Sequence, residues 1–181
     1  MITVPKIQIA LKRKYLNNSI VMAPNVYLWG SFKSDFVRVT KSGYGIEYEI
    51  KLSKSDFKAD FKKSNLKIEG INNDRHVIYS SFKKHEWLLS GKGPTEFYYV
   101  FPESLINPND VPDLAGIVIA REIPPSEYYT QSHVRVHLLR KAKRLNREPL
   151  SDMKIKNIYT SCYYRYWTEV EKRNTNQILM L

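Results

Sequence analysis

The spacing of hydrophobic and polar residues predicts a β-hairpin near the start of the chain. Segment 46–52 alternates strictly, and it follows a β-prone segment, 36–40, and turn residues at 41–45. The apolar face of segment 46–52 consists of Ile46, Tyr48, Ile50 and Leu52, and the opposite face carries Glu47, Glu49 and Lys51. The charged face therefore gathers three ionisable groups on one strand.

Other patterns predict further elements on both sides of this hairpin. Helical spacing indicates a basic helix over 7–16 and a long helix over 152–172, with a loop expected at 17–24. Short apolar runs predict strands at 26–29, 97–101, 116–120 and 132–139. Ser53 and Asp56 match a capping box, so a helix should begin there and pack Phe57 and Phe61 inward. Because helices and strands alternate, we expect an α/β fold with a central mixed β-sheet flanked by helices.

The length and composition favour one domain. The 181 residues suit a single domain with a core at about 26–140, a basic aromatic helical region at about 141–173 and a tail at 174–181. One cysteine, Cys162, excludes a cysteine-based zinc site and is expected to be a buried structural thiol. No run of 18 apolar residues and no secretion signal is present, so we expect a cytoplasmic protein without membrane contact.

The charge indicates a polyanionic partner, with DNA the first expectation. Lys and Arg number 29 against 18 acids, which gives a net charge of +11. A basic block at 131–173 is interleaved with aromatic residues, for which core packing is favoured over base stacking. The candidate DNA contacts are Lys54, Lys58, Lys62, Arg140, Lys141, Lys143, Arg144 and Arg147.

The hairpin also brings together groups that suit metal chemistry. A three-residue loop at 42–44 would set Asp35 opposite Lys51, with Cβ atoms about 5 Å apart, and Glu49 diagonal to Asp35 at about 7–8 Å. Two carboxylates this close suit Mg²⁺ or Mn²⁺, and a neighbouring lysine would orient a water for attack on phosphorus. The alternative is a solvent-exposed strand face that carries an ion pair.

In their order along the chain, these residues resemble the PD-(D/E)XK nuclease superfamily. Asp35, then Glu49-Ile50-Lys51, then a helix form the motif, and segment 48–63 looks like the small phage and prophage-type members related to RecB-like nucleases. Segments 84–87, 97–102 and 111–116 are also similar to that group, so the resemblance runs from about 29 to 147. It implies a restriction-endonuclease-like core and a metal-dependent phosphodiesterase that acts on DNA.

The resemblance also implies roles for individual residues. Asp35, Glu49 and the Ile50 carbonyl would bind Mg²⁺, with Mn²⁺ as a substitute, and Lys51 would be the catalytic lysine. Lys84 and His85 would match a polar position that contacts phosphate, although a surface histidine is an equal reading of His85.

The chain departs from the family pattern in two respects. Asp35 is the first acid, so no acid comes from the first helix, and Ser34 stands where a proline often precedes the aspartate. The site would then use fewer protein ligands, borrow Glu47, or be weakened. Asp56 is read as a capping acid rather than a ligand.

Two other functions remain open on the sequence alone. One is a catalytically inactive DNA-binding protein on the same fold. The other is a phage-type accessory protein that binds a host protein through its aromatic surface. A homodimer and a phage or host DNA-processing partner are further open alternatives, and if the protein is phage-encoded its compartment is the host cytoplasm.

Overall fold

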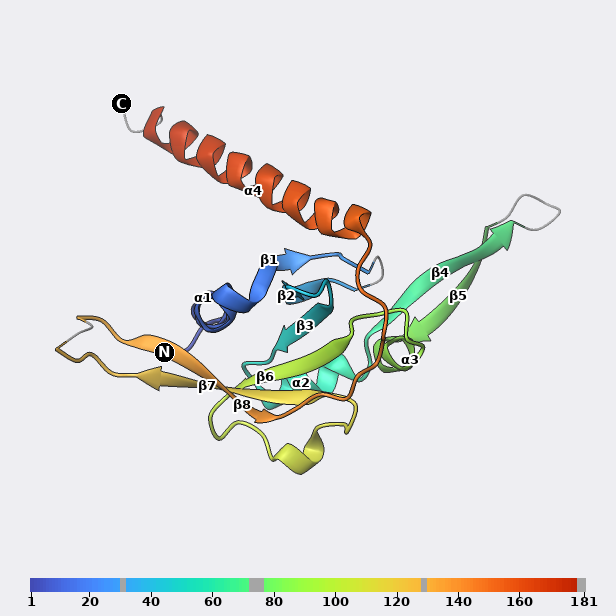
Figure 1. Ribbon diagram of the computed structural model, residues 1–181, viewed down its shortest axis with the longest axis horizontal. Coiled ribbons are helices and arrows are strands. Elements are labelled where there is room, and N and C mark those ends of the chain that lie inside the picture. The colour runs from blue at the N-terminus through green and yellow to red at the C-terminus, as the bar shows by residue number, and fades with distance from the viewer. Residues whose placement is uncertain (30–31, 72–76, 128–129, 179–181) are drawn as a thin grey trace.

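A mixed six-stranded sheet forms the centre of the structure (Figure 1). The computed structural model describes residues 1–29, 32–71, 77–127 and 130–178, and every count of elements refers to those residues. In sheet order the strands are β1 (Ser19–Val26), β2 (Ser34–Thr40), β3 (Gly45–Ile50), β6 (Glu96–Pro102), β7 (Gly116–Ile123) and β8 (His133–Arg140). The β3–β6 and β6–β7 pairs are parallel and the others antiparallel. The expected α/β class with a central mixed sheet is therefore confirmed.

Helices cover both faces of this sheet. On one face, α1 (Val4–Tyr15) packs Ile7, Ala10 and Leu11 against apolar residues of β3, β6, β7 and β8. On the other face, α2 (Lys54–Asp60), α3 (Lys84–Leu89) and α4 (Asp152–Ile178) contribute Phe57, Leu88 and Ile158 to a second core. Two single-turn 3₁₀ segments, Leu16–Asn18 and Pro108–Asp110, complete the helical elements of the described residues.

The first strand differs from the expectation. Residues 19–26 form β1, so a loop at 17–24 and a strand at 26–29 were both wrong. Proline cannot donate a ladder hydrogen bond, and Pro24 made the segment look like a loop. Because β1 is at the edge of the sheet, that missing donor is tolerated there.

The hairpin is present, but its register differs by two residues from the expected one. The loop consists of Lys41, Ser42 and Gly43, because the Thr40 N–H donates to the Tyr44 carbonyl and Gly43 has a φ of +80°. Val37 therefore lies opposite Glu47 rather than Glu49. Since side chains alternate with a period of two, this even shift keeps the charged residues of β3 on the face of Asp35.

A two-stranded ribbon, which the sequence pattern did not predict, separates α2 from α3. Strands β4 (Ser64–Ile71) and β5 (Val77–Lys83) pair antiparallel and project away from the main sheet (Figure 1). At its base the Lys84 N–H donates to the Lys63 carbonyl at 3.0 Å. The chain thus leaves the main body at Lys63 and returns beside it at Lys84.

The C-terminal helix α4 lies along β1 and continues beyond it (Figure 1). Helix α4 is anchored by Tyr159, which donates to the Ile20 carbonyl, and by Arg165, which donates to the Pro24 carbonyl. Its helical path runs to Ile178, so residues 174–178 are helix rather than a tail, and 141–151 precede the helix. None of the helices in the described residues is long and apolar enough to cross a membrane.

The aromatic residues of α4 are exposed, so the expectation that they form core was wrong. Tyr159, Tyr163, Tyr164, Tyr166 and Trp167 are 45–65% exposed, whereas Ile158 is buried and Cys162 partly buried. Helix α4 packs on the body along β1, and this contact buries Ile158 but leaves the five rings exposed.

Gly116 is a tightly packed position of the sheet. It lies opposite Tyr98 in the β6–β7 ladder, and Tyr98 stacks on Tyr48 with ring centroids 5.3 Å apart. A Cβ at Gly116 would lie 2.6 Å from the Ala142 nitrogen and well inside contact distance of the Tyr98 ring. We predict that Gly116→Ala lowers the free energy of unfolding by about 1–3 kcal/mol, as overpacking does.

Urea denaturation followed by circular dichroism measures this loss. Ser42→Ala, in the exposed hairpin loop, is the control and should leave the midpoint unchanged. An unchanged midpoint for Gly116→Ala would contradict the packing described for the β6–β7 ladder.

Candidate functional site

The charged face of β3 is buried rather than exposed. Glu47, Glu49 and Lys51 are 1%, 2% and 1% exposed, because α2 and α3 cover this face of the sheet. The alternative of a solvent-exposed ion pair is therefore wrong. Buried charges must be matched by partners, since transfer of an unpaired ion from water into the interior costs several kcal/mol.

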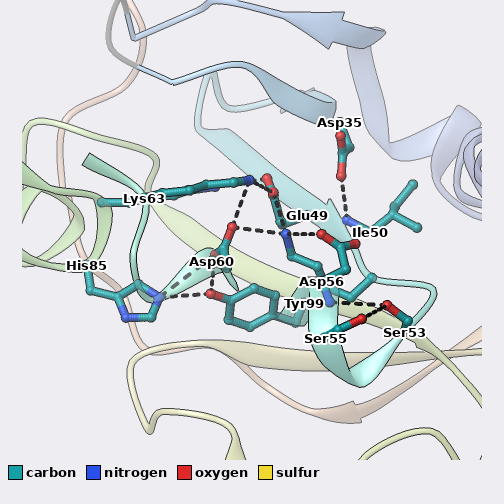
Figure 2. Close-up of polar contacts among 12 residues, drawn as sticks. Asp35, Glu49, Ile50, Ser53, Ser55, Asp56, Asp60, Lys63, His85 and Tyr99 are labelled. Carbon is teal, nitrogen blue, oxygen red and sulfur yellow. Dashed lines mark hydrogen bonds and ion pairs between the residues drawn. The ribbon is translucent and has the colours of Figure 1, made fainter. Parts of the chain in front are cut away.

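Glu49 is matched by three lysines that come from three parts of the chain, of which Figure 2 labels Lys63. Its Oε1 accepts from Lys51 at 2.9 Å and from Lys63 at 2.6 Å, and its Oε2 accepts from Lys84 at 2.8 Å. Burial raises the pKa of Glu49, but the ammonium groups, Lys84 foremost, outweigh it and hold the pKa below its usual range. Glu49 is therefore ionised at neutral pH.

Asp60, at the end of α2, is a buried carboxylate that sequence reasoning did not select. Its Oδ1 accepts from Lys51 at 2.9 Å and lies 2.8 Å from Lys63, so both ammonium groups bridge Asp60 and Glu49. Burial raises its pKa, and Lys84 and Lys51 reverse that shift, so the pKa lies well below its usual range. A signal was present in the sequence: Asp60 follows Phe57 by three residues, which puts it on the buried face of the helix.

Lys84 and Glu47 complete a set that we call the carboxylate–lysine cluster: Glu47, Glu49, Lys51, Asp60, Lys63 and Lys84. Lys84 is 1% exposed, and its ammonium lies 3.2 Å from Glu47 Oε1. Burial raises the pKa of Glu47, as does Glu49, while Lys84 and the nearby Ser34 hydroxyl lower it. Three acids and three lysines thus balance within the cluster. Lys63 is the outermost of the lysines, with 41% of its side chain exposed.

Asp35 lies beside this cluster on the next strand. Its Oδ2 accepts the Ile50 N–H at 2.8 Å, which ties the start of β2 to the end of β3 (Figure 2). Burial and the nearby Glu49 carboxylate raise the pKa of Asp35. Among the described residues, no lysine or arginine is within ion-pair distance of Asp35. The sequence-predicted set Asp35, Glu49 and Lys51 is thus brought together, in the shifted register.

A chain of hydrogen bonds connects Asp60 to His85. Tyr99, opposite Glu49 on β6, donates to Asp60 Oδ2 at 2.5 Å, and His85 Nε2 lies 2.8 Å from the Tyr99 oxygen. Because the Tyr99 proton goes to the carboxylate, His85 Nε2 must carry the proton of the second bond. Burial lowers the pKa of His85, which keeps the ring neutral. His85 is therefore a fixed, partly buried residue, and Tyr99 is a second group that the sequence did not reveal.

The candidate DNA contacts are dispersed over the surface. Lys54, Lys58 and Lys62 are exposed as expected, although the helix ends at Asp60 and Lys62 follows it. Arg140 donates to the carbonyls of Pro108, Val111, Pro112 and Ala115, so its guanidinium holds that loop in place. Arg144 stacks on the Tyr44 ring at 4.4 Å, Lys143 faces Asp113 at 3.9 Å, and Lys141 and Arg147 are exposed.

Comparisons with known proteins bear on the fold alone. No family model matches the sequence, and no curated protein matches it. The fold is similar to a solved structure described as the SPO1766 protein of unknown function from Silicibacter pomeroyi. That structure has a TM-score of 0.52 at 14% identity, over 93% of this chain and 86% of the other. At this identity the likeness extends to the architecture and not to the site.

The buried lysine gives a prediction with a defined pH dependence. Lys84→Met would leave Glu47 and Glu49 short of a counter-charge, and we expect it to lower the free energy of unfolding by about 3–5 kcal/mol near neutral pH. Loss of Lys84 raises the pKa of both carboxyl groups, and for Glu47, whose pKa burial already raises, stability is lost as the pH rises through that pKa. The deficit should therefore be smaller near pH 5 than near pH 8.

Denaturant titrations at the two pH values measure this deficit. Lys92→Met, at an exposed lysine, is the matched control and should change stability little at either pH. A deficit that is small, or that grows as the pH falls, would show that Lys84 does not neutralise the two glutamates.

Proposed function

We propose that the protein is a metal-dependent phosphodiesterase that cleaves DNA and has a restriction-endonuclease-like core. The observation that carries the proposal is the position of Asp35 beside Glu49, at the end of β3. The cluster balances its own three acids with three lysines, so Asp35 adds a fourth carboxylate with no ammonium of its own among the described residues. A cation between Asp35 and Glu49 would relieve this repulsion.

The donor atoms at this place suit a hard divalent cation. Asp35, Glu49 and the Ile50 carbonyl would hold Mg²⁺, or Mn²⁺ in its place, because these ions prefer oxygen ligands. The Ile50 carbonyl points to the same side of β3 as its N–H, which faces Asp35. Such an ion, when bound, supplies a water of lowered pKa and stabilises charge on the phosphoryl oxygens.

Lys51 is suited to orient the attacking water. Two of its three ammonium protons go to Glu49 and Asp60, and Asp56 lies 3.6 Å away on the exposed side. The third proton is directed to the side of Asp56, where a water or a phosphate oxygen would replace that longer ion pair. Asp60 would take the place of the acid that the first helix lacks, with Tyr99 and His85 fixing its carboxylate.

The proposal predicts metal-dependent cleavage of DNA. With Mg²⁺ or Mn²⁺ the wild type should cut labelled single- or double-stranded DNA, and EDTA should stop it. Glu49→Gln and Lys51→Met should each lower the rate by roughly 100-fold or more, as loss of a transition-state contact does. Asp110→Asn, at an exposed acid remote from β3, is the control and should cut normally.

Absence of metal-dependent cutting by the folded wild type would overturn the proposal. It would favour the second candidate, a non-catalytic DNA-binding protein in which the cluster is structural. The observation behind that candidate is that three ammonium groups already satisfy Glu49.

The proposal also predicts an effect of Lys63 on metal affinity, because its ammonium contacts the same Glu49 oxygen as that of Lys51. A cation that approaches Glu49 from outside would displace the partly exposed Lys63 before the buried Lys51. Lys63→Ala should therefore tighten Mn²⁺ binding by roughly tenfold, equivalent to about 1.4 kcal/mol.

Titration of the DNA-free protein with Mn²⁺, followed by electron paramagnetic resonance, measures this affinity. Lys62→Ala removes an exposed lysine one position away and should bind Mn²⁺ like the wild type. Equal affinities for Lys63→Ala and the wild type would mean that the ion does not bind at Glu49.

A further inference from the structure

The excess positive charge of the chain is confined to two segments that contain no acid. Residues 1–34 hold five Lys and Arg residues and residues 128–147 hold six, with no Asp or Glu in either. Of the 29 cations, 18 therefore remain for the rest of the chain, where they equal the 18 acids. The whole net charge of +11 comes from these two segments.

The fold packs these two segments against each other. Helix α1 lies on β8, where Ile7, Ala10 and Leu11 share a core with Val134 and Val136, and Lys14 donates to the Val136 carbonyl at 3.0 Å. Between them is a groove of about 340 Å³, lined by Ala10, Arg13, Lys14, His133, Val134, Arg135 and Val136. None of these lining residues is acidic.

A second depression of about 420 Å³ meets the first at the edge strand β8, on the face of the sheet away from α1. It shares Arg135 and Val136 with the first and adds Arg121, Ile123 and His137. Arg121 forms an ion pair with Glu103. The Glu122 Oε1 forms an ion pair with the amino nitrogen of Met1 at 2.8 Å. In the described part of the chain, Arg13 and Arg135 have no carboxylate within ion-pair distance. The two depressions therefore form one groove around the β8 edge, with Arg13 exposed on the α1 side and Arg135, which alternates with the buried Val134 and Val136, exposed on the other face.

We propose that this α1–β8 groove binds the phosphate backbone of a nucleic acid. A guanidinium presents paired N–H donors that match phosphate oxygens, and a row of cations suits a partner with evenly repeated anions. Protein partners and membranes both need apolar contact area, usually with aromatic anchors. Here the apolar lining consists of alanine, valine and isoleucine, and the remaining lining residues are arginine, lysine and histidine.

The groove is separate from the carboxylate–lysine cluster. Helix α1 covers the opposite face of the sheet from α2, and β8, which carries Arg135, is three strands away from β3 in the sheet. The inference extends the proposed function by assigning a second contact to the nucleic acid, and it does not require cleavage.

Binding in EDTA tests the groove without any contribution from catalysis. Fluorescence anisotropy with labelled single- and double-stranded DNA would be measured for the wild type and for Arg13→Ala/Arg135→Ala over a series of salt concentrations. We expect the double variant to lose at least about tenfold in affinity. The slope of log affinity against log salt should fall by about 1.8, or 0.9 for each lost phosphate contact with a duplex.

The matched control is Lys41→Ala/Lys92→Ala, which removes two exposed cations outside the groove and should bind nearly as the wild type does. Circular dichroism would establish that both variants fold, as expected for exposed side chains. An unchanged affinity and slope for Arg13→Ala/Arg135→Ala, or an equal loss in the control, would overturn the inference. Displacement of DNA by polyglutamate of equal charge, or equally tight binding to anionic vesicles, would also overturn it.

Discussion

The burial of Glu49 is the constraint on which the rest of the structure depends. An ionised carboxylate is tolerated in a protein interior only when several donors surround it. Those donors come from Lys51, directly after β3, from Lys63, after α2, and from Lys84, at the start of α3. The positions of both helices over the sheet are thus tied to the two oxygens of Glu49. Two of the three ammonium groups, those of Lys51 and Lys63, also hold Asp60. Because these ion pairs connect α2 and α3 to β3, a substitution that removes one of the ammonium groups should also weaken the packing of a helix on the sheet.

The sequence was sufficient for the general architecture and for the parity of the hairpin. Strict alternation located β3, and Ser53 capped α2 as expected, with its Oγ accepting the Asp56 N–H. The sequence pattern did not predict the register of the β2–β3 hairpin. That register depends on which turn residue takes the left-handed conformation, and the residue is Gly43. The error did not move Glu49 to the wrong face, because a shift of two residues preserves the alternation.

The remainder of the site was not predictable because it depends on contacts that are distant in sequence. A lysine reads as a solvated residue in any single-sequence pattern, yet Lys84 is enclosed by acids on a neighbouring strand. Tyr99 has the pattern of one more apolar strand residue, and only the fold brings its hydroxyl to Asp60. On α4 the error had the opposite sign. Large aromatic residues such as Trp167 are typical of a core, but in this helix the rest of the protein does not cover them.

The closure of the chain at Lys63 and Lys84 has a consequence for how this protein can vary. The two ends of the β4–β5 ribbon are joined by the backbone hydrogen bond between Lys84 and Lys63. The distance between the ends therefore does not depend on the length of the ribbon. Lengthening or shortening a segment between fixed ends costs little entropy, on the order of 0.6 kcal/mol for a doubling. The segment between these two lysines can therefore change in length while Lys63 and Lys84 keep their positions around Glu49.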